Sequence, residues 1–405
     1  MLSVEEAQQQ VLAAVARLDA EERALGDALD AILARDAVAD IDLPPFANSA
    51  MDGFAVHASD TANASPARPA VLPVIGEIAA GDAGSLVVPP GSAARIMTGA
   101  PMPAGADAVV PVERTASDPR GVRVLAHVAV GASVRASGDD FHRGATVLSE
   151  GTLLRPGEIG LLASCGYARV PVYRRPVVAV LSTGNELVSV DQLPRAGQIR
   201  NSNAPMLAAQ ILSAGAIPRI LPVAKDTRED VLAAIEVGRT AGMDMIVSSG
   251  GVSVGDYDVV REVIEHMGGI DFWRVRMRPG KPIAFGRAGQ TPFLGLPGNP
   301  VSSFVTFELF ARPMLRKMAG HRALLRRAIA MRADGPVPGA SDRQHYVRAF
   351  ARWEDDGWHV AVVGRQESHL LQSAIAVNAL IVVPEGSPDR ESGSSVHVIL
   401  LDLPE

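Results

Sequence analysis

The chain has 405 residues, of which 47% are hydrophobic and 20% charged, with a net charge of −7 and a pI near 5.8. This length exceeds one ordinary hydrophobic core and predicts roughly two to four domains. The acidic balance argues against broad binding of nucleic acid or anionic membranes. The single cysteine, Cys165, excludes an internal disulfide and a cysteine-based metal cluster. No signal peptide or bilayer-spanning apolar stretch is visible, so we expect a cytoplasmic protein.

Residues 3–37 predict two amphipathic helices. Ser3 and Glu6 have the spacing of a capping box, and they precede the first apolar run. A second apolar run lies around Leu25, Leu29, Ile32 and Leu33. We interpret both helices as packing or dimer-contact elements without chemistry. The Leu43-Pro-Pro-Phe46 segment then breaks the helical pattern and marks a boundary.

Residues 70–140 contain short alternating strands rich in Val, Gly and Pro, which predict a small β domain. Three polar turns lie in or just before this stretch, at Asp52-Gly53, at Thr98-Gly99 and at Asp139-Asp140. An aspartate in a turn usually bonds its own backbone, so none of these turns identifies a site by itself. We expect this β domain, residues 45–144, to be inserted between two parts of a mixed, helical first domain at 1–44 and 145–175.

From residue 176 the pattern alternates strand and helix, which predicts a three-layer α/β domain over residues 176–327. The uninterrupted apolar strand Val177–Leu181 is typical of a parallel sheet buried on both faces. Thr227 can cap a following helix at 228–239. The loops after the strands should gather Glu186, Asp226 and Asp256 at one edge, because open α/β folds bind ligands beyond the carboxyl ends of their strands.

The stretch Ile246–Asp258 leads from an apolar strand through glycines into a helix. Glycines at 250, 251 and 255 allow positive φ and close approach of a ligand to the backbone. A helix start beside open N–H groups attracts phosphate or another oxyanion. An ordinary glycine-rich turn between strand and helix is an equally good interpretation of these residues alone.

The segment Phe272–Pro282 concentrates Arg274, Arg276, Arg278 and Lys281, and strand alternation would place the three arginines on one face. A second glycine turn, Pro297-Gly-Asn-Pro300, precedes a helix at 301–317, where Asn299 can be the cap and Pro300 suits the first turn. Residues 328–405 predict a separate β domain. The nine histidines show no metal-binding spacing.

Carboxylates and a cationic stretch thus surround one glycine-rich loop. A purely anionic ligand would be repelled by the carboxylates, and a purely cationic ligand by the arginines. A phosphate-bearing ligand with Mg²⁺ satisfies both, since the metal binds carboxylate oxygens and bridges to phosphate. The sequence therefore predicts nucleotidyl or phosphoryl chemistry.

Seven motifs in order resemble one family. They are Ser49-Ala-Met-Asp-Gly-Phe-Ala, Met97-Thr-Gly-Ala, Gly138-Asp-Asp, Ser182-Thr-Gly-Asn-Glu-Leu, Gly197-Gln-Ile-Arg-Asn-Ser-Asn, Ser249-Gly-Gly-Val-Ser-Val-Gly-Asp-Tyr-Asp and Leu296-Pro-Gly-Asn-Pro-Val. Together they are similar to the molybdopterin molybdenumtransferase family, which includes MoeA and the E-domain of gephyrin. Each motif alone is weak, but seven in register across nearly the whole chain are highly specific.

The resemblance implies an elongated homodimer that takes adenylated molybdopterin and molybdate, inserts the metal and releases AMP with the help of Mg²⁺. It implies an active site between the α/β domain of one subunit and the β domain of the other. The adenylating enzyme and molybdoenzyme acceptors are further partners that it suggests. The functional acids of the family, together with the threonine of its Thr-Gly loop, fall on Asp52, Thr98, Asp140, Glu186, Asp226 and Asp256.

The resemblance and the residue chemistry together suggest roles for these groups. Glu186 and Asp256 would hold Mg²⁺ or orient pterin and phosphate. Arg274, Arg278 and Lys281 would bind molybdate or phosphate. The expected substrate-binding positions in the three loops are Thr183, Gly184, Ser249, Gly250, Gly251, Ser253, Gly255, Pro297, Gly298, Asn299 and Pro300.

Two positions depart from the family pattern. Arginine stands at 274 and 278 where lysine is common, which changes the geometry of hydrogen-bond donation. Asn201 stands where many members have aspartate. Three alternatives stay open from sequence: a scaffold that binds partner peptides, as gephyrin-type E-domains do, a tungstate-selective paralogue, and a plain nucleotide hydrolase.

Overall fold

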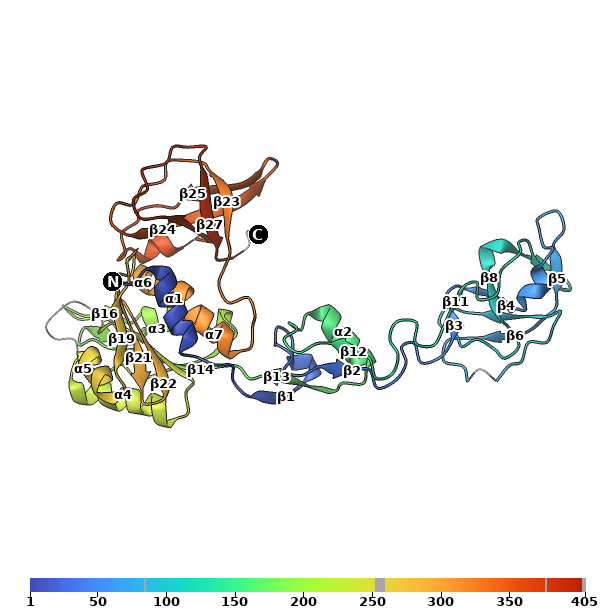
Figure 1. The fold of residues 1–405 in the computed structure, drawn as a ribbon, viewed down its shortest axis with the longest axis horizontal. Coiled ribbons are helices and arrows are strands. Elements are labelled where there is room, and N and C mark those ends of the chain that lie inside the picture. The colour runs from blue at the N-terminus through green and yellow to red at the C-terminus, as the bar shows by residue number, and fades with distance from the viewer. Residues whose placement is uncertain (84, 252–258, 376, 403–405) are drawn as a thin grey trace. The chain divides into compact units, whose positions relative to one another are not determined.

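The computed structural model describes the chain except for residues 84, 252–258, 376 and 403–405. It divides into two compact units (Figure 1). The first comprises Met1–Glu22, Asp30–Ala34 and Pro171–Glu405, and the second comprises Arg23–Leu29 and Arg35–Val170. The finer division into four domains stays a prediction.

The first unit is built on a six-stranded sheet with the order β17-β14-β18-β22-β21-β19. The strands from β17 to β22 pair in parallel, and β21 and β19 add antiparallel partners at one edge. The strands of this sheet are β14 (Val177–Ser182), β17 (Ile217–Ile220), β18 (Met245–Ser249), β19 (Ile270–Arg274), β21 (Pro282–Ala288) and β22 (Thr291–Leu296).

Helices cover both faces of this sheet, as the three-layer prediction requires. One face carries α3 (Asn203–Ser213), α6 (Pro300–Thr306), the π-helix η4 (Phe307–Ala311) and α7 (Arg312–Met318). The other face carries α4 (Arg228–Thr240) and α5 (Val259–Met267). A short parallel pair, β15 (Leu187–Val188) and β16 (Ile199–Arg200), stands beside the sheet.

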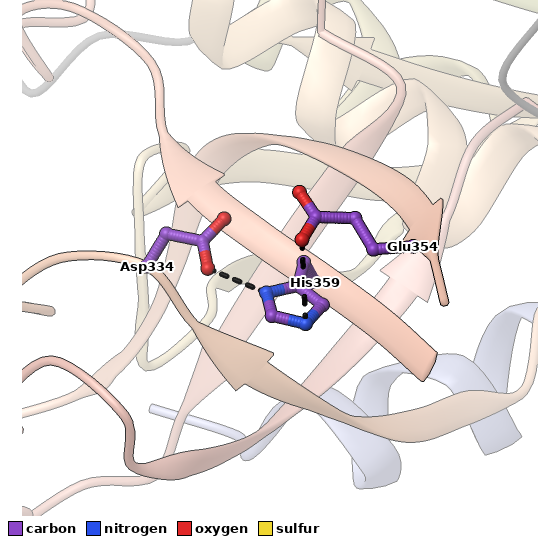
Figure 2. A group of neighbouring side chains, drawn as sticks. All are labelled: Asp334, Glu354 and His359. Atoms are coloured by element: carbon purple, nitrogen blue, oxygen red, sulfur yellow. Dashed lines mark hydrogen bonds and ion pairs between the residues drawn. The ribbon is translucent and has the colours of Figure 1, made fainter. Parts of the chain in front are cut away.

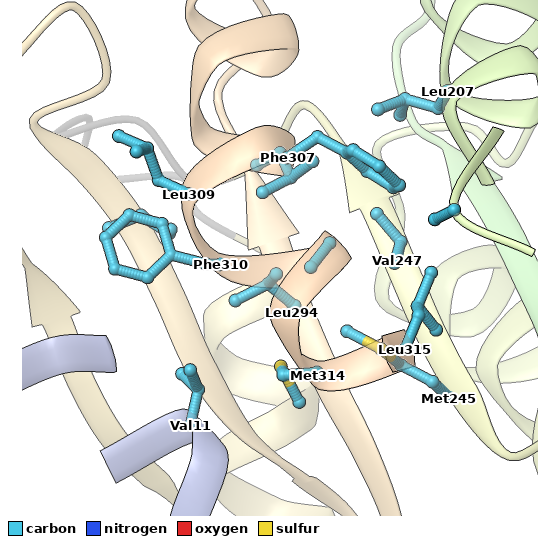
Figure 3. Close-up of a cluster of buried hydrophobic side chains, with 14 of the residues drawn as sticks. Val11, Leu207, Met245, Val247, Leu294, Phe307, Leu309, Phe310, Met314 and Leu315 are labelled. Carbon is cyan, nitrogen blue, oxygen red and sulfur yellow. The ribbon is translucent and has the colours of Figure 1, made fainter. Parts of the chain in front are cut away.

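Alternate residues of β14 pack to opposite sides. Val178 and Val180 join the cluster under α3, α6 and α7, whereas Ala179 and Leu181 join the cluster under α4 and α5. Figure 3 shows the first cluster, with side chains of the sheet meeting those of the η4 and α7 segment. A strand buried on both faces therefore needs an unbroken apolar run, which is what the sequence has.

The N-terminal helix α1 (Val4–Ala13) confirms the first helix prediction. The Ser3 backbone N–H donates to Glu6 Oε2 at 2.7 Å and the Glu6 N–H donates to Ser3 Oγ at 3.1 Å, which is the capping box. Val11 packs among the side chains of η4 and α7 (Figure 3). The helix thus belongs to the core of the first unit.

The second predicted helix is wrong. Residues 20–24 form strand β1 (Ala20–Ala24), followed by the 3₁₀ turn η1 (Leu25–Asp27). Asp30 has φ of 61°, which a helix does not allow, and Leu33 forms a β-bridge with Val172. Of the apolar residues in this run, Ile32 and Leu33 are buried and Leu29 is exposed, so the helical spacing does not correspond to one buried helix face.

The C-terminal residues form a closed β-barrel. The strands are β23 (Ala328–Ala333), β24 (Gln344–Glu354), β25 (Gly357–Val362), β26 (Ala379–Val383) and β27 (Ser395–Leu400). They pair around a ring, because β24 contacts both β25 and β26. Strand β20 (Met277–Arg278) leaves the α/β region and pairs with the start of β24. The ring closure removes sheet edges and explains a stable small β domain without long helices.

A buried histidine ties the barrel strands together (Figure 2). His359 Nδ1 lies 2.6 Å from Asp334 Oδ1, and Nε2 lies 2.7 Å from Asp356 Oδ1. Asp334, Glu354 and His359 have ligand atoms within 4.8 Å of one another, a spacing that could hold a metal ion. Arg352 already pairs with both Asp334 and Glu354, at 2.8 and 2.6 Å, so we interpret the group as a salt-bridge network.

The network predicts a pH-dependent stability of the barrel. Hydrogen bonds to Asp334 and then Asp356 raise the pKa of His359 above 6.5. Its contribution to the free energy of unfolding is thus fully present below the pKa of the unfolded chain and is lost as pH rises through the folded value. Denaturant unfolding between about pH 6 and about pH 9 should show this loss in the native chain and not in His359→Gln. Equal pH slopes for both proteins would contradict the assignment.

The second unit is mostly short strands, as predicted. A four-stranded sheet has the order β6-β7-β4-β8, and a three-stranded sheet has the order β5-β10-β9. Its elements are β2 (Ala37–Val38), β3 (Asn48–Ser49), β4 (Gly53–Val56), η2 (Ala58–Thr61), β5 (Ala70–Leu72), β6 (Val74–Ile78), β7 (Ala93–Ile96), β8 (Ala108–Pro111), η3 (Val112–Arg114), β9 (Thr115–Asp118), β10 (Gly121–Val124), β11 (Val134–Arg135), β12 (Thr146–Leu148) and α2 (Pro156–Ser164). Strand β13 (Arg169–Tyr173) returns the chain to the first unit, and in that unit the 3₁₀ turn η5 (Leu371–Ala374), between β25 and β26, contacts α6. Among the described helices, none has the length and apolar content that crossing a membrane requires.

Candidate functional site

Three loops meet at the carboxyl edge of the parallel strands. Ser182, Ser249 and Leu296, the last residues of β14, β18 and β22, stand in register. The Thr183 N–H donates to the Ser249 carbonyl at 3.4 Å, and the Gly250 N–H donates to the Leu296 carbonyl at 3.1 Å. The sheet therefore brings together the substrate-binding positions that the sequence predicts at Thr183, Gly184, Ser249, Gly250, Gly251, Pro297, Gly298, Asn299 and Pro300.

The backbone of the glycine turn needs glycine for two reasons. Gly250 and Gly251 have φ of 93° and 67°, in the region that L-residues rarely adopt. A Cβ at Gly251 would also come within 2.3 Å of Val260 Cγ2. The predicted site residues Ser253, Gly255 and Asp256 lie outside the described residues.

Asn203, the last residue of the Gly197–Asn203 motif, forms hydrogen bonds to two of the loops. It lies at the start of α3, and its Nδ2 donates to Ser249 Oγ at 2.7 Å and to the Gly298 carbonyl at 2.8 Å. Ser249 Oγ in turn lies 3.5 Å from Ser303 Oγ. One amide group thus fixes the spacing between the glycine turn and the Pro-Gly-Asn-Pro turn.

Replacing Asn203 by aspartate should loosen this edge. The side chain keeps its shape but loses the amide donor, and it places a carboxylate beside the Gly298 carbonyl. We expect the free energy of unfolding to fall by about 1–3 kcal/mol, with weaker substrate binding. Urea unfolding and the KM for substrate measure the two effects. Unchanged values in both would show that Asn203 does not hold the loops.

The carboxylates of this edge lie on exposed turns. Asp226 and Asn185 are held together, since the Asn185 N–H donates to Asp226 Oδ2 at 3.3 Å and the Asp226 N–H donates to Asn185 Oδ1 at 3.4 Å. Glu186 is exposed, and a Cβ on Gly184 would come within 2.5 Å of its Oε2. Glycine at 184 therefore leaves room for the Glu186 carboxylate at the end of β14. Oxygen donors of this kind suit Mg²⁺.

Asn201, where the sequence departs from the pattern of the family that it resembles, has a structural role here. Its side chain is buried, and its Oδ1 accepts from the Ala204 N–H at 3.2 Å and from Ser182 Oγ at 3.3 Å. The amide oxygen caps the start of α3 as a carboxylate would. The substitution thus keeps the local hydrogen bonds and removes one negative charge.

A cavity of about 530 Å³ opens between the α/β region and the barrel, and cationic side chains line it. Arg278 and Lys281 come from the predicted cationic stretch, whereas Arg343, Ser368 and His369 come from the barrel side. The two acids in the lining are already paired, Asp342 with Arg343 and Glu367 with Arg365. Arg278 and Lys281 make no ion pair within the described part of the chain. The cavity therefore favours an anion.

The residues that the barrel contributes were not found from the sequence. Asn299 stands at the N-cap position of α6 as predicted, but its side chain does not cap the helix. Its Nδ2 instead donates to Ser368 Oγ at 3.1 Å, and the Val301 N–H donates to the Ser368 carbonyl at 3.2 Å. The Pro-Gly-Asn-Pro turn and the Ser368 segment are thereby joined at the wall of the cavity.

The arginine row divides between two sheets. Arg274, Arg276 and Arg278 are exposed and alternate with buried neighbours, as predicted. However, β19 ends at Arg274 in the α/β sheet, whereas Arg278 lies on β20 beside the barrel. Of the three, only Arg278 lines the 530 Å³ cavity. The prediction that one strand presents all three arginines is wrong.

In the second unit, two of the predicted residues meet. Asp52 Oδ1 accepts from both the Thr98 N–H and the Thr98 hydroxyl, each at 2.7 Å. The backbone bond first, and then the hydroxyl, lower the pKa of Asp52 below 3.8, so it is ionised at neutral pH. Asp140 is exposed on a separate turn, where its N–H donates to the Leu43 carbonyl at 2.9 Å.

Comparison with known proteins places these features in one family. Residues 2–166 match the MoeA N-terminal region (domain I and II), residues 179–317 match a probable molybdopterin binding domain, and residues 330–401 match the MoeA C-terminal region (domain IV). A Mycobacterium tuberculosis protein named molybdopterin molybdenumtransferase 2 is 39% identical over 376 residues, covering 91% of each chain. A Bacillus subtilis molybdopterin molybdenumtransferase is 38% identical over 93% of this chain and 89% of its own length.

Solved structures of other proteins match the fold of this chain over nearly its whole length. A crystal structure of the molybdopterin biosynthesis MoeA protein from Pyrococcus horikosii has a TM-score of 0.84 and 30% sequence identity, and the match covers 99% of each chain. A second similar structure, a molybdenum cofactor biosynthesis protein from Pyrococcus furiosus, has a TM-score of 0.61 at 21% identity, which supports the fold.

Proposed function

This chain belongs to the MoeA family of molybdopterin molybdenumtransferases, and from that membership we propose that it inserts molybdenum from molybdate into molybdopterin. The relatives that carry this name match nine-tenths of the chain. The fold agrees with this assignment, because it contains the α/β region, the inserted β region and the C-terminal barrel of the family.

The observation that carries the proposal is the cationic cavity at the end of the parallel strands. A tetrahedral molybdate dianion fits a site that offers the Arg278 and Lys281 charges with hydroxyls at Ser302 and Ser368. The glycine turn and the two neighbouring loops would place the phosphates of an adenylated pterin beside helix starts, which favour anions. Substrate binding at the two places would bring molybdate and pterin to the same edge of the sheet.

Adenylated molybdopterin is the substrate form that we propose, with AMP as the second product. Cleaving its phosphoanhydride develops negative charge on the leaving phosphate, which Lys281 and a bound Mg²⁺ would stabilise. Glu186 offers a suitable oxygen ligand, and Asp256 is its proposed partner. The described residues alone supply no complete cluster of metal ligands at this edge. Mg²⁺ therefore enters as a cofactor that the substrate phosphates help to bind.

A homodimer would complete the site. Asp52 and Thr98 form an ionised, hydrogen-bonded pair on the surface of the second unit. We propose that this pair and Asp140 face the glycine turn of the partner subunit in a cytoplasmic dimer. Sedimentation equilibrium tests the dimer directly. Complementation between inactive Asp52→Ala and Lys281→Met chains tests the sharing of sites, because mixed dimers would regain one intact site.

The deciding assay is AMP release from adenylated molybdopterin with and without molybdate. We expect release that depends on both molybdate and Mg²⁺, and that stops when EDTA removes the metal. Supplying tungstate with molybdate and analysing the metal in the product reports the oxyanion preference. AMP release from ordinary dinucleotides without the pterin would contradict the assignment and favour a nucleotide hydrolase.

A further inference from the structure

The second unit presents an arginine beside the Asp52–Thr98 pair. Arg95 lies on β7, where it stands opposite Phe54 on the antiparallel neighbour β4. Asp52 comes just before β4 and Thr98 just after β7, so the antiparallel pairing brings the polar residues to one end of the sheet. The bonds from the Thr98 N–H and hydroxyl lower the pKa of Asp52, and the Arg95 charge lowers it further. The guanidinium and the carboxylate therefore share one electrostatic environment.

Phe54 holds the guanidinium of Arg95 in place. The Arg95 Cζ atom lies over the Phe54 ring, 5.2 Å from its centroid, which is a cation–π contact. Phe54 is buried in the core of the second unit, and Arg95 is half-buried. A guanidinium that lies over an aromatic ring keeps its edge N–H groups free to donate hydrogen bonds. The contact thus removes part of the side-chain freedom before any ligand binds.

The hydrogen-bond donors of Arg95 are unused. Within the part of the chain that the structure describes, its guanidinium makes no hydrogen bond and no ion pair. Arg120 of the same unit shows the usual arrangement, because its Nε donates to Asp118 Oδ1 at 3.1 Å. Asp52 has a different partner, since its Oδ1 accepts from the N–H and the hydroxyl of Thr98. The fork of N–H groups on Arg95 is therefore available to an anion from outside the chain.

An ionised aspartate alone would not suit the substrate that we propose. Adenylated molybdopterin carries phosphate groups, and the carboxylate of Asp52 would repel them. The charge of Arg95 beside it offsets this repulsion, and the edge of a guanidinium matches two oxygens of one phosphate. This end of the sheet thus combines a hydrogen-bond acceptor with a cation that suits a phosphate.

We propose that Arg95 binds the phosphate that leaves in AMP, next to Asp52 and Thr98, and that Phe54 is the positioning residue that holds it. This inference rests on the proposed function, including the site that the partner subunit completes. It assigns the phosphate contact of the second unit to one residue. Such a contact contributes to the binding of AMP and not to that of adenosine, because the two ligands differ only in the phosphate.

Calorimetric titration of the full-length chain with AMP and with adenosine tests this assignment. Arg95→Met removes the donors and keeps an extended side chain. We expect its AMP affinity to fall by about ten- to a hundredfold, the range for a charged hydrogen bond, while its adenosine affinity stays within about twofold. Arg95→Lys keeps the charge without the two-pronged edge, so it should retain part of the AMP affinity.

Arg123→Met is the matched control. Arg123 is an exposed arginine on β10, in the three-stranded sheet of the same unit. Its replacement changes the net charge as Arg95→Met does, and we expect it to leave both affinities unchanged. Urea unfolding shows that each variant is folded under the conditions of the titration.

Two results would overturn the proposal. Equal weakening of AMP and adenosine in Arg95→Met would mean that Arg95 only supports the structure. Unchanged AMP affinity in both Arg95→Met and Arg95→Lys would mean that it does not touch the phosphate. In either case, AMP release by the native chain would leave the proposed function standing. A native chain that neither binds nor releases AMP would instead contradict the proposed function, and the phosphate contact with it.

Discussion

The Lys281→Met variant is expected to release AMP from adenylated molybdopterin about a hundredfold more slowly than the native chain at saturating pterin. Lys281 lines the 530 Å³ cavity and makes no ion pair within the described residues, so its charge is available to a bound oxyanion. Methionine keeps the length of the side chain and removes the charge. Because the charge acts on molybdate and on developing phosphate charge, both the KM for molybdate and kcat should change.

Arg276→Met is the matched control. Arg276 belongs to the same cationic stretch, but it pairs with Glu385 at 3.6 Å and does not line the cavity. Its loss should leave turnover within about twofold, since an exposed ion pair contributes little. Equal losses in the two variants would mean that net charge, and not the cavity, controls the reaction. Full activity of Lys281→Met would remove this lysine from the site.

Gly53→Ala is expected to destabilise the second unit by about 3 kcal/mol, at the upper end of overpacking costs. Gly53 begins β4, which pairs with both β7 and β8. A Cβ at this position would lie 2.1 Å from the Val110 carbonyl oxygen, which belongs to the backbone of β8. A strand held on both sides cannot move away, so the ladder must open next to Asp52.

Gly160→Ala is the control for this substitution. Gly160 is exposed inside α2, and a Cβ there has nothing within 4 Å. Alanine should therefore stabilise the helix by about 0.5–1 kcal/mol. Thermal unfolding measures the change in stability of each variant. Limited proteolysis then shows whether cleavage falls within residues 35–170. A stable, fully active Gly53→Ala chain would contradict the packing of β4 described above.

Much of the α/β region could be predicted because its signals are local. Apolar runs such as Val177–Leu181 identify buried parallel strands, and Ser3 with Glu6 and Thr227 mark helix starts that the structure confirms. Parallel strands place their following loops at one edge by geometry alone, so the meeting of the Thr183, Gly250 and Pro297 segments follows from strand order.

Where the spacing was ambiguous, the local signal failed. The run from Leu25 to Leu33 has helical spacing, but Leu33 pairs with Val172 far along the chain. The arginines at 274 and 278 keep the predicted alternation, yet the chain passes between them from one sheet to another. Pairing partners distant in sequence override local periodicity, and no pattern within the segment records them.

The sequence alone determined the family, the α/β plus β architecture and the loops that gather at the strand ends, because these depend on motifs and on the direction of consecutive strands. Only the tertiary structure decided which cations share a cavity, that Asn299 bonds Ser368 and leaves its helix uncapped, and that Arg348 is buried with unused donors. These facts depend on how the barrel packs against residues that are distant from it in sequence. Asn299 and Ser368, for example, are 69 positions apart and share a hydrogen bond. Such contacts are set by the closure of the whole fold, and local residue chemistry does not contain them.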